Sequence, residues 1–216
     1  MTEIVEGPKL AALSCGKAAF LVVLLHGEGA DGRSMVDQAL NWAPTLPKAE
    51  FLAAEAPGGR WFDPDEEGGL ERGLAALHAF LDAALAARRL PPSHLALVGF
   101  SQGATLALRA GLSRPGPVKA VVAVAGGPYG PLPIGEGAPP ILLIHGDADE
   151  DAPLSAMREA KAAIAARGGK VWSMTRKGVG HAFDDDGVLA AGDFLTEHVA
   201  SKKGEDHDHD DHDHDH

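Results

Sequence analysis

The stretch "LALVGFSQGATLAL", residues 95–108, joins a short apolar run to a run that is rich in alanine and leucine. Its first four residues are continuously apolar, which is typical of a strand covered on both faces of a parallel sheet. The residues from Ala104 onward favour a helix. Between the two runs, residues 99–103 spell Gly-x-Ser-x-Gly, a tight turn that exposes the hydroxyl of Ser101 at the helix N-terminus. The stretch therefore predicts a strand, a sharp turn and a helix, with a serine displayed above the sheet.

Ser101 has two interpretations in this setting. The five-residue string would arise by chance in about one chain in eight of this composition, and a serine before a helix can serve only as its N-cap. The buried strand before the turn and the strong helix after it favour a nucleophilic serine, because the flanking glycines let strand and helix approach closely.

The rest of the chain alternates between the same two kinds of segment. Further strands are expected over residues 20–25, 51–54, 118–124, 141–144 and 171–175, and helices over 34–42, 70–89, 154–166 and 183–200. Strands that alternate with helices predict a mainly parallel, doubly wound sheet flanked by helices. The first dozen residues can add an edge strand.

Composition favours one compact domain without nucleic acid or membrane partners. The chain has 216 residues, 45% of them hydrophobic, which suits a single core over 1–203. Of the formal charge of −12, seven acids lie from Glu205 onward, and nothing forms the basic face that nucleic acid requires. Residues 18–25 are too short for a membrane span and lack a cleavage signal. The single cysteine, Cys15, predicts a reduced thiol and a cytoplasmic location.

A nucleophilic serine requires a base, and His181 is the histidine best placed to supply it. On a parallel sheet the acid and then the histidine should follow the serine, each after a later strand. His181 lies in "RKGVGHAFDDD", directly after the strand expected at 171–175. His26 and His145 sit at strand ends and are expected to brace their loops.

The acid belongs to the loop "HGDADEDAP", residues 145–153, where four carboxylates crowd together. Asp149 lies far enough out for its side chain to turn back toward His181, and we favour it as the orienting acid. Asp147 comes directly at the strand end and is expected to stabilise the loop as a cap.

With these motifs the chain resembles the phospholipase/carboxylesterase/thioesterase family of small α/β-hydrolases, which includes acyl-protein thioesterases and compact bacterial esterases. The resemblance runs over residues 20–199 through "LHGEGADG", "RWFD", "GFSQGA", "HGDADEDAP" and "GHAFD", in that order. It implies an α/β-hydrolase fold with Ser101 as nucleophile, His181 as general base and then acid, and Asp149 as orienting carboxylate. Dienelactone hydrolases share the fold but use cysteine at the position of Ser101.

The loop "GEGADG", residues 27–32, also spells Gly-x-Gly-x-x-Gly, the fingerprint of a dinucleotide site, with Glu55 as a candidate for the ribose-binding acid. Glu28 and Asp31 oppose that interpretation, because they would place carboxylates beside a diphosphate. The family resemblance implies another use, in which the backbone N–H groups of Glu28 and Gln102 form an oxyanion hole. No cofactor is then expected.

Two loops bear on the substrate. Trp61 and Phe62 lie in "PGGRWFDPDEEGG", residues 57–69, where Trp61 is expected to anchor the loop to the core. By the resemblance this loop borders the active site, so both aromatic residues are candidates for substrate binding. The segment "GGPYGPLPIGEGAPP", residues 126–140, is too short and proline-rich for a large cap domain, so an open site is expected.

The expected function is hydrolysis of small-molecule esters or thioesters through an acyl-enzyme. Relatives often place an apolar residue where this chain has Glu28, and a carboxylate is costly to desolvate. We therefore expect short to medium or polar acyl groups, the alternative being a long-chain acyl thioesterase or lysophospholipase. The chain can act alone or as a homodimer, and the sequence favours neither.

The segment "GEDHDHDDHDHDH", residues 204–216, contains no apolar residue and is expected to be disordered. Its histidines alternate with aspartates and can wrap divalent Ni, Cu or Zn without a shaped site; they are His207, His209, His212, His214 and His216. A metal-binding protein that acts through this tail is the alternative from a different class.

Overall fold

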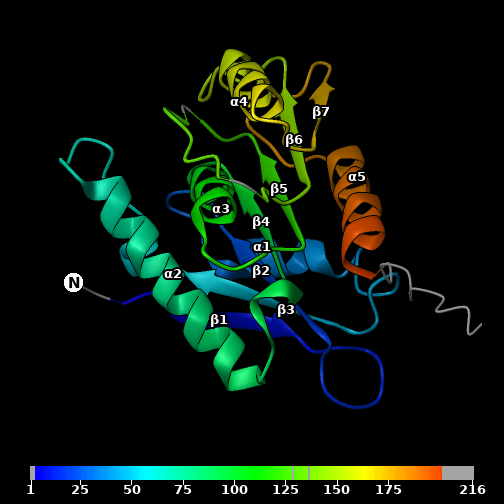
Figure 1. Ribbon diagram of the computed structural model, residues 1–216. Helices are drawn as coiled ribbons and strands as arrows, with labels where there is room; N and C mark the ends of the chain where they lie inside the picture. The colour runs from blue at the N-terminus through cyan, green and yellow to red at the C-terminus, as the bar shows by residue number, and fades with distance from the viewer. Residues whose placement is uncertain (1–2, 128, 136, 201–216) are drawn as a thin grey trace, which may run out of the picture.

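The computed structural model describes residues 3–200 except 128 and 136, and within them a seven-stranded sheet of order β1-β3-β2-β4-β5-β6-β7 (Figure 1). The strands are β1 (Val5–Leu10), β2 (Phe20–Leu25), β3 (Ala49–Glu55), β4 (Leu95–Phe100), β5 (Ala120–Val124), β6 (Ile141–Gly146) and β7 (Val171–Arg176). β1 pairs antiparallel with β3, and every other pairing is parallel. The mainly parallel sheet and the N-terminal edge strand are as predicted.

Helices cover both faces of this sheet. They are α1 (Gly32–Ala39), α2 (Gly69–Arg88), α3 (Gln102–Ser113), α4 (Leu154–Ala166) and α5 (Asp185–Leu195), with short 3-10 turns at Pro57–Gly59 and Pro92–His94 and a π-helical turn at Thr196–Ala200. α2, α3 and α4 pack on one face, and α1 and α5 pack on the other (Figure 1). The arrangement is the doubly wound one that alternating strands and helices predict.

The strand β2 shows why a continuous apolar run belongs at the centre of such a sheet. Leu21, Val23 and Leu25 point into the core beneath α2 and α3. Val22 and Leu24 point into the opposite core with α1 and α5. All five side chains are fully buried. Because successive strand residues face opposite sides, a strand that is covered on both faces must be apolar at every position.

Two helix limits differ from the sequence prediction because of local capping. α1 begins ahead of the predicted range 34–42, since the Asp31 side chain accepts the Ser34 N–H at 3.2 Å and caps the helix. The helix predicted over 183–200 begins two residues later, because Asp184 is its N-cap and accepts the Gly187 N–H at 3.2 Å.

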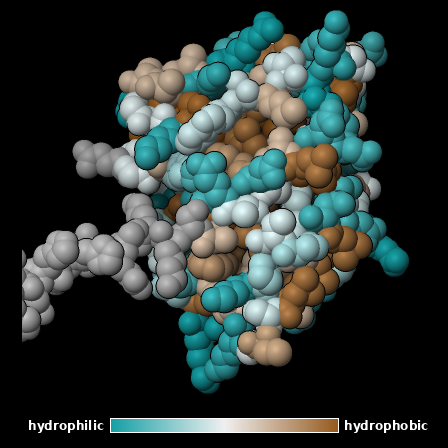
Figure 2. Space-filling view, turned by 90° about the vertical axis from the view of Figure 1, so that its right-hand side faces the viewer, coloured by the Kyte–Doolittle hydropathy of each residue, from teal (hydrophilic) through white to brown (hydrophobic). Residues whose placement is uncertain are grey.

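The connection between β5 and β6 holds no helix in its described residues, so no large cap covers the ends of the strands there. On the side of the molecule where α5 lies, hydrophobic side chains are dispersed among hydrophilic ones (Figure 2). Within the described chain, no helix combines the length and the apolar character that crossing a membrane requires.

Candidate active site

Ser101 occupies a strained turn between β4 and α3. Its backbone has φ 54° and ψ −120°, a combination that side-chain-bearing residues rarely adopt. A Cβ on Gly99 would collide with the carbonyl of Gly103, and a Cβ on Gly103 would collide with the carbonyl of Leu25. Both glycines of the motif are therefore needed for α3 to start directly against the sheet, which holds the serine at the helix N-terminus.

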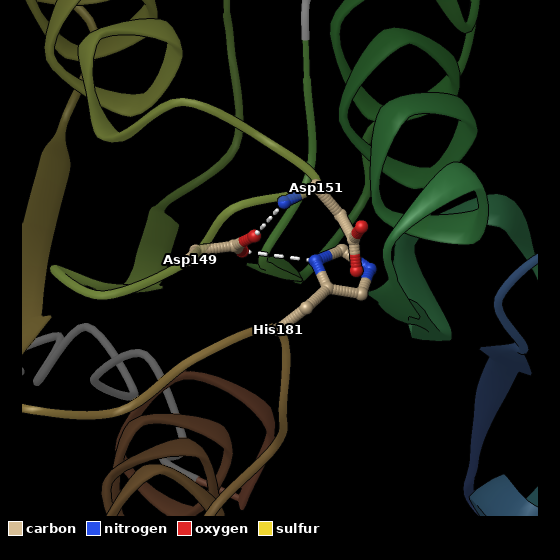
Figure 3. A group of neighbouring side chains, drawn as sticks. All are labelled: Asp149, Asp151 and His181. Carbon is tan, nitrogen blue, oxygen red and sulfur yellow. Dashed lines mark hydrogen bonds and ion pairs between the residues drawn. The ribbon is translucent and has the colours of Figure 1, made fainter.

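Three loops that follow parallel strands bring Ser101, Asp149 and His181 together. Ser101 follows β4, Asp149 follows β6 and His181 follows β7. His181 Nε2 lies 2.8 Å from Ser101 Oγ, and His181 Nδ1 lies 2.9 Å from Asp149 Oδ2, the contact drawn in Figure 3. When Nδ1–H donates to the carboxylate, Nε2 is left free to accept the serine proton. This is the geometry that nucleophilic catalysis by serine requires.

The carboxylate of Asp149 is buried and fully engaged. Its side chain is 1% exposed. Oδ1 accepts the backbone N–H groups of Asp151 and Ala152, both at 2.9 Å. Burial by itself would raise the pKa of Asp149, but the bonds from the Ala152 N–H and from His181 outweigh it and lower that pKa. The carboxylate is therefore ionised at neutral pH, as an acid that orients a histidine must be.

His145 and Asp147 support the same loop from other directions. His145 is buried, with Nε2 at 2.9 Å from the carbonyl oxygen of Ala152 and at 3.3 Å from Asp149 Oδ2. Asp147 Oδ1 accepts the N–H of Gly178 at 2.6 Å and ties the loop after β6 to the loop after β7. Asp147 thus lies where a loop cap was expected, and Asp149 is the acid that the structure places beside the imidazole.

The loop after β2 lies directly against the serine. A Cβ on Gly27 would come within 3.3 Å of Ser101 Cβ, so the backbone of the next residue, Glu28, runs beside the nucleophile. Within the described part of the chain, neither the Glu28 N–H nor the Gln102 N–H is bound to an acceptor. Gln102 is also the first residue of α3, where the helix dipole favours negative charge. Two unengaged donors near a serine can stabilise an oxyanion.

Arg60 joins this site, and the sequence analysis did not single it out. Its Nε donates to Glu28 Oε1 at 2.5 Å, and its Nη1 lies 3.5 Å from Asp63 Oδ2. Gln102 Nε2 donates to the other Glu28 oxygen at 3.3 Å. The Glu28 side chain is 42% exposed and faces solvent as expected, but it is paired with Arg60 as well.

Trp61 is a buried anchor at 5% exposure. Its indole Nε1 donates to the carbonyl of His26 at 2.7 Å, and its backbone N–H donates to Gln102 Oε1 at 2.7 Å. Gln102 Nε2 also donates to the carbonyl of Phe62 at 3.0 Å. The loop that carries both aromatic residues is thus fixed to the start of α3, while Phe62 stays half-buried.

His26 braces its loop. Its ring is fully buried. Nδ1 lies 2.7 Å from the carbonyl of Gly27, and Nε2 accepts the N–H of Ala56 at 3.2 Å. Glu55, the candidate ribose-binding acid, is also engaged within the protein, because its Oε1 accepts the Gly32 N–H at 3.0 Å. The glycine-rich loop is therefore built around internal contacts instead of a dinucleotide cradle.

The fold and this group of side chains define an α/β-hydrolase of the esterase and thioesterase type. A sequence model of the phospholipase/carboxylesterase family matches residues 12–199, and the chain belongs to that family. The chain is 30% identical over 190 residues to esterase YpfH of Escherichia coli K12, covering 81% of each protein. It is 22% identical over 235 residues to acyl-protein thioesterase 1 of Neurospora crassa, covering 92% of this chain and 95% of that one.

Solved structures agree with this assignment. Esterase PE8 has a TM-score of 0.83 and 36% identity, covering 91% of this chain and 100% of the other. Among the sequence relatives, the chain also matches NocK of Nocardia uniformis at 30% identity, but this match covers 66% of this chain and only 43% of that protein. The predicted fold class and the predicted hydrolase class are both confirmed, with small-molecule esters as the substrates that such relatives imply.

Proposed function

We propose that the enzyme cleaves carboxylic esters or thioesters through an acyl-enzyme formed on Ser101. The observation that carries this proposal is the continuous hydrogen-bonded chain from Ser101 Oγ through both nitrogens of His181 to Asp149, with contacts of 2.8 and 2.9 Å. His181 is the general base and then the general acid, and Asp149 holds its tautomer and orientation.

The reaction begins when His181 Nε2 takes the proton of Ser101 as Oγ attacks the carbonyl carbon of the ester. The carbonyl oxygen becomes negative and is held by the backbone N–H groups of Glu28 and Gln102. His181 then gives its proton to the departing alcohol or thiol, which leaves the acyl group on Ser101. A water molecule repeats the sequence and releases the acid. Each step uses groups of the chain itself, so we expect no requirement for a metal or cofactor.

The preferred acyl groups are short to medium or polar. Glu28 and Arg60 place a partly exposed ion pair beside the oxyanion position. A long apolar chain laid over this pair would displace its water without offering hydrogen bonds in return, which is costly. The second candidate is a long-chain acyl thioesterase, and the similarity to an acyl-protein thioesterase favours it.

A hydrolysis panel of esters and thioesters with graded acyl length separates the two candidates. Ser101→Ala is the control, because it removes the nucleophile and keeps the fold. A kcat/KM that peaks at short or medium chains supports the first candidate, and one that rises steadily to palmitoyl substrates supports the second. If Ser101→Ala hydrolyses these substrates as fast as the unmodified enzyme, the mechanism itself is wrong.

The remaining expectations stay predictions. They concern a single domain over 1–203, a cytoplasmic location, substrate contacts by Trp61 and Phe62, and the choice between monomer and homodimer. The segment that is expected to bind metal ions, residues 204–216, lies outside the described residues.

A further inference from the structure

A second carboxylate approaches the catalytic imidazole from the solvent side. The Asp151 backbone N–H binds Asp149, while the Asp151 side chain turns back along the ring of His181 (Figure 3). One oxygen of each aspartate and one nitrogen of His181 all lie within 4.8 Å of one another. The two acids differ in environment, since Asp149 is 1% exposed and Asp151 is exposed. Asp151 is therefore a solvent-exposed carboxylate beside the imidazole that contacts Ser101.

The charge of Asp151 is not compensated by a neighbouring cation in the described residues. None of their lysine or arginine side chains forms an ion pair with it. Arg60, the cation next to the loop after β2, is already shared between Glu28 and Asp63. A substrate on Ser101 thus meets an exposed negative charge close to the imidazole and a guanidinium that is already neutralised.

We propose that Asp151 sets the charge selectivity of this hydrolase: it disfavours esters that carry an anionic group near the scissile bond and favours neutral or cationic ones. The proposal rests on the serine mechanism proposed above. Ser101 Oγ lies 2.8 Å from the imidazole that Asp151 approaches, so a charged group next to the scissile bond comes near the Asp151 carboxylate. For charges about 7 Å apart and an effective dielectric of about 40 to 50, the attraction or repulsion changes kcat/KM roughly five- to sevenfold.

A ratio of substrates isolates this effect from any change in the imidazole itself. Three acetate esters of similar leaving-group size serve as probes: the cationic choline ester, its neutral 3,3-dimethylbutyl analogue and an anionic 3-carboxypropyl ester. Asp151→Asn keeps the shape and the backbone N–H but removes the charge. Glu150→Gln is the matched control, because it removes the same charge from the exposed neighbouring residue.

In Asp151→Asn the ratio of kcat/KM for the anionic over the neutral ester should rise roughly five- to sevenfold at low ionic strength. The cationic-over-neutral ratio should fall, and Asp151→Lys should move both ratios further. Salt should shrink these differences, since exposed charges are screened. Glu150→Gln should leave both ratios near those of the unmodified enzyme.

Unchanged ratios in Asp151→Asn, measured while the neutral ester is still hydrolysed, would overturn the selectivity role and leave the proposed function intact. An equal shift in Glu150→Gln would also overturn it, because net charge alone would then explain the preference. Absence of any ester hydrolysis by the unmodified enzyme would instead overturn the proposed function and, with it, the role of Asp151.

Discussion

Replacement of Asp149 by asparagine tests which acid orients the histidine. The amide has nearly the same shape as the carboxylate. Its oxygen can still accept the N–H groups of Asp151 and Ala152, which in the unmodified protein lie 2.9 Å from Asp149 Oδ1. Its NH₂ group then faces His181 Nδ1, at the position where Oδ2 accepts at 2.9 Å. A donor there forces Nδ1 to be the acceptor and moves the ring proton to Nε2, the nitrogen that must take the proton of Ser101.

The expected cost follows from these contacts. The wrong tautomer should lower kcat by about 10⁴ with little change in KM. Charge-assisted hydrogen bonds to Asp149 become neutral ones, which should lower the free energy of unfolding by about 1–2 kcal/mol. For a domain of this size that loss corresponds to roughly 2–8 °C in Tm. Steady-state kinetics on a short-chain ester and a thermal melt measure the two effects separately.

Asp147→Asn is the matched control, because it changes the same group two positions away in the same loop. Its amide oxygen can still accept the N–H of Gly178, which lies 2.6 Å from Oδ1. Turnover close to that of the unmodified enzyme is therefore expected. If Asp147→Asn loses more turnover than Asp149→Asn while both proteins remain folded, the assignment of the acid is wrong.

Four further outcomes are expected. Ser101→Ala and His181→Ala should each lower turnover by roughly 10⁴–10⁶, and the double variant should be little worse than either, since the residues act as a unit; additive losses would contradict this. Across graded acyl esters, kcat/KM should peak at short or medium chains, and a steady rise to palmitoyl esters would refute the preference. A chain that ends at Lys203 should keep full hydrolysis and lose most binding of divalent nickel. Nickel binding by the full chain should weaken below about pH 6.5, because the histidines become protonated. If truncation abolishes hydrolysis and added zinc restores it, the active site is not metal-independent. The hydrogen bond from Arg176 lowers the pKa of Asp184 in the folded protein, although partial burial acts in the opposite direction. The Asp184 carboxylate therefore stabilises the fold above the unfolded-state pKa of about 3.9, and this stabilisation is lost as the pH falls through the lower pKa of the folded state. Asp184→Asn, which keeps the helix cap, should therefore lower Tm at neutral pH and reduce the fall in Tm between about pH 5 and 2, as thermal melts at several pH values would show. If Tm falls as steeply in this pH range as in the unmodified protein, the explanation is wrong.

The sheet could be predicted because each central strand carries its own signal. The run at 20–25 is apolar at every position, and burial on both faces leaves no other choice. Element limits were less predictable, since they depend on side chains that reach across the fold. Trp42 was placed in the first helix, but it lies beyond the end of α1, and its Nε1 donates to the carbonyl of Val188 at 2.8 Å. A partner 146 positions away leaves no trace in a local pattern.

The positions of Ser101, Asp149 and His181 were predictable for a topological reason. In a parallel sheet, loops that follow successive strands emerge at one edge, so chain order and strand ends suffice to bring three distant residues together. The choice between Asp147 and Asp149 was harder, because both lie within one short loop. What separates them in the structure is the direction of each side chain, one toward Gly178 and the other toward His181.

Arg60 shows where such reasoning ends and what the structure adds to it. Its partner Glu28 is 32 positions away, and Gln102 helps to hold the loop that carries Arg60 in place through the Trp61 N–H and the Phe62 carbonyl. The sequence argument treated Glu28 as a lone carboxylate that must face water. The pair changes the reason for the expected polar preference, since the obstacle that we propose for a long acyl chain is an ion pair next to the Glu28 backbone. It also leaves Arg60 paired with two carboxylates, so the exposed carboxylate of Asp151 near His181 is the charge to which, in our proposal, an approaching substrate responds.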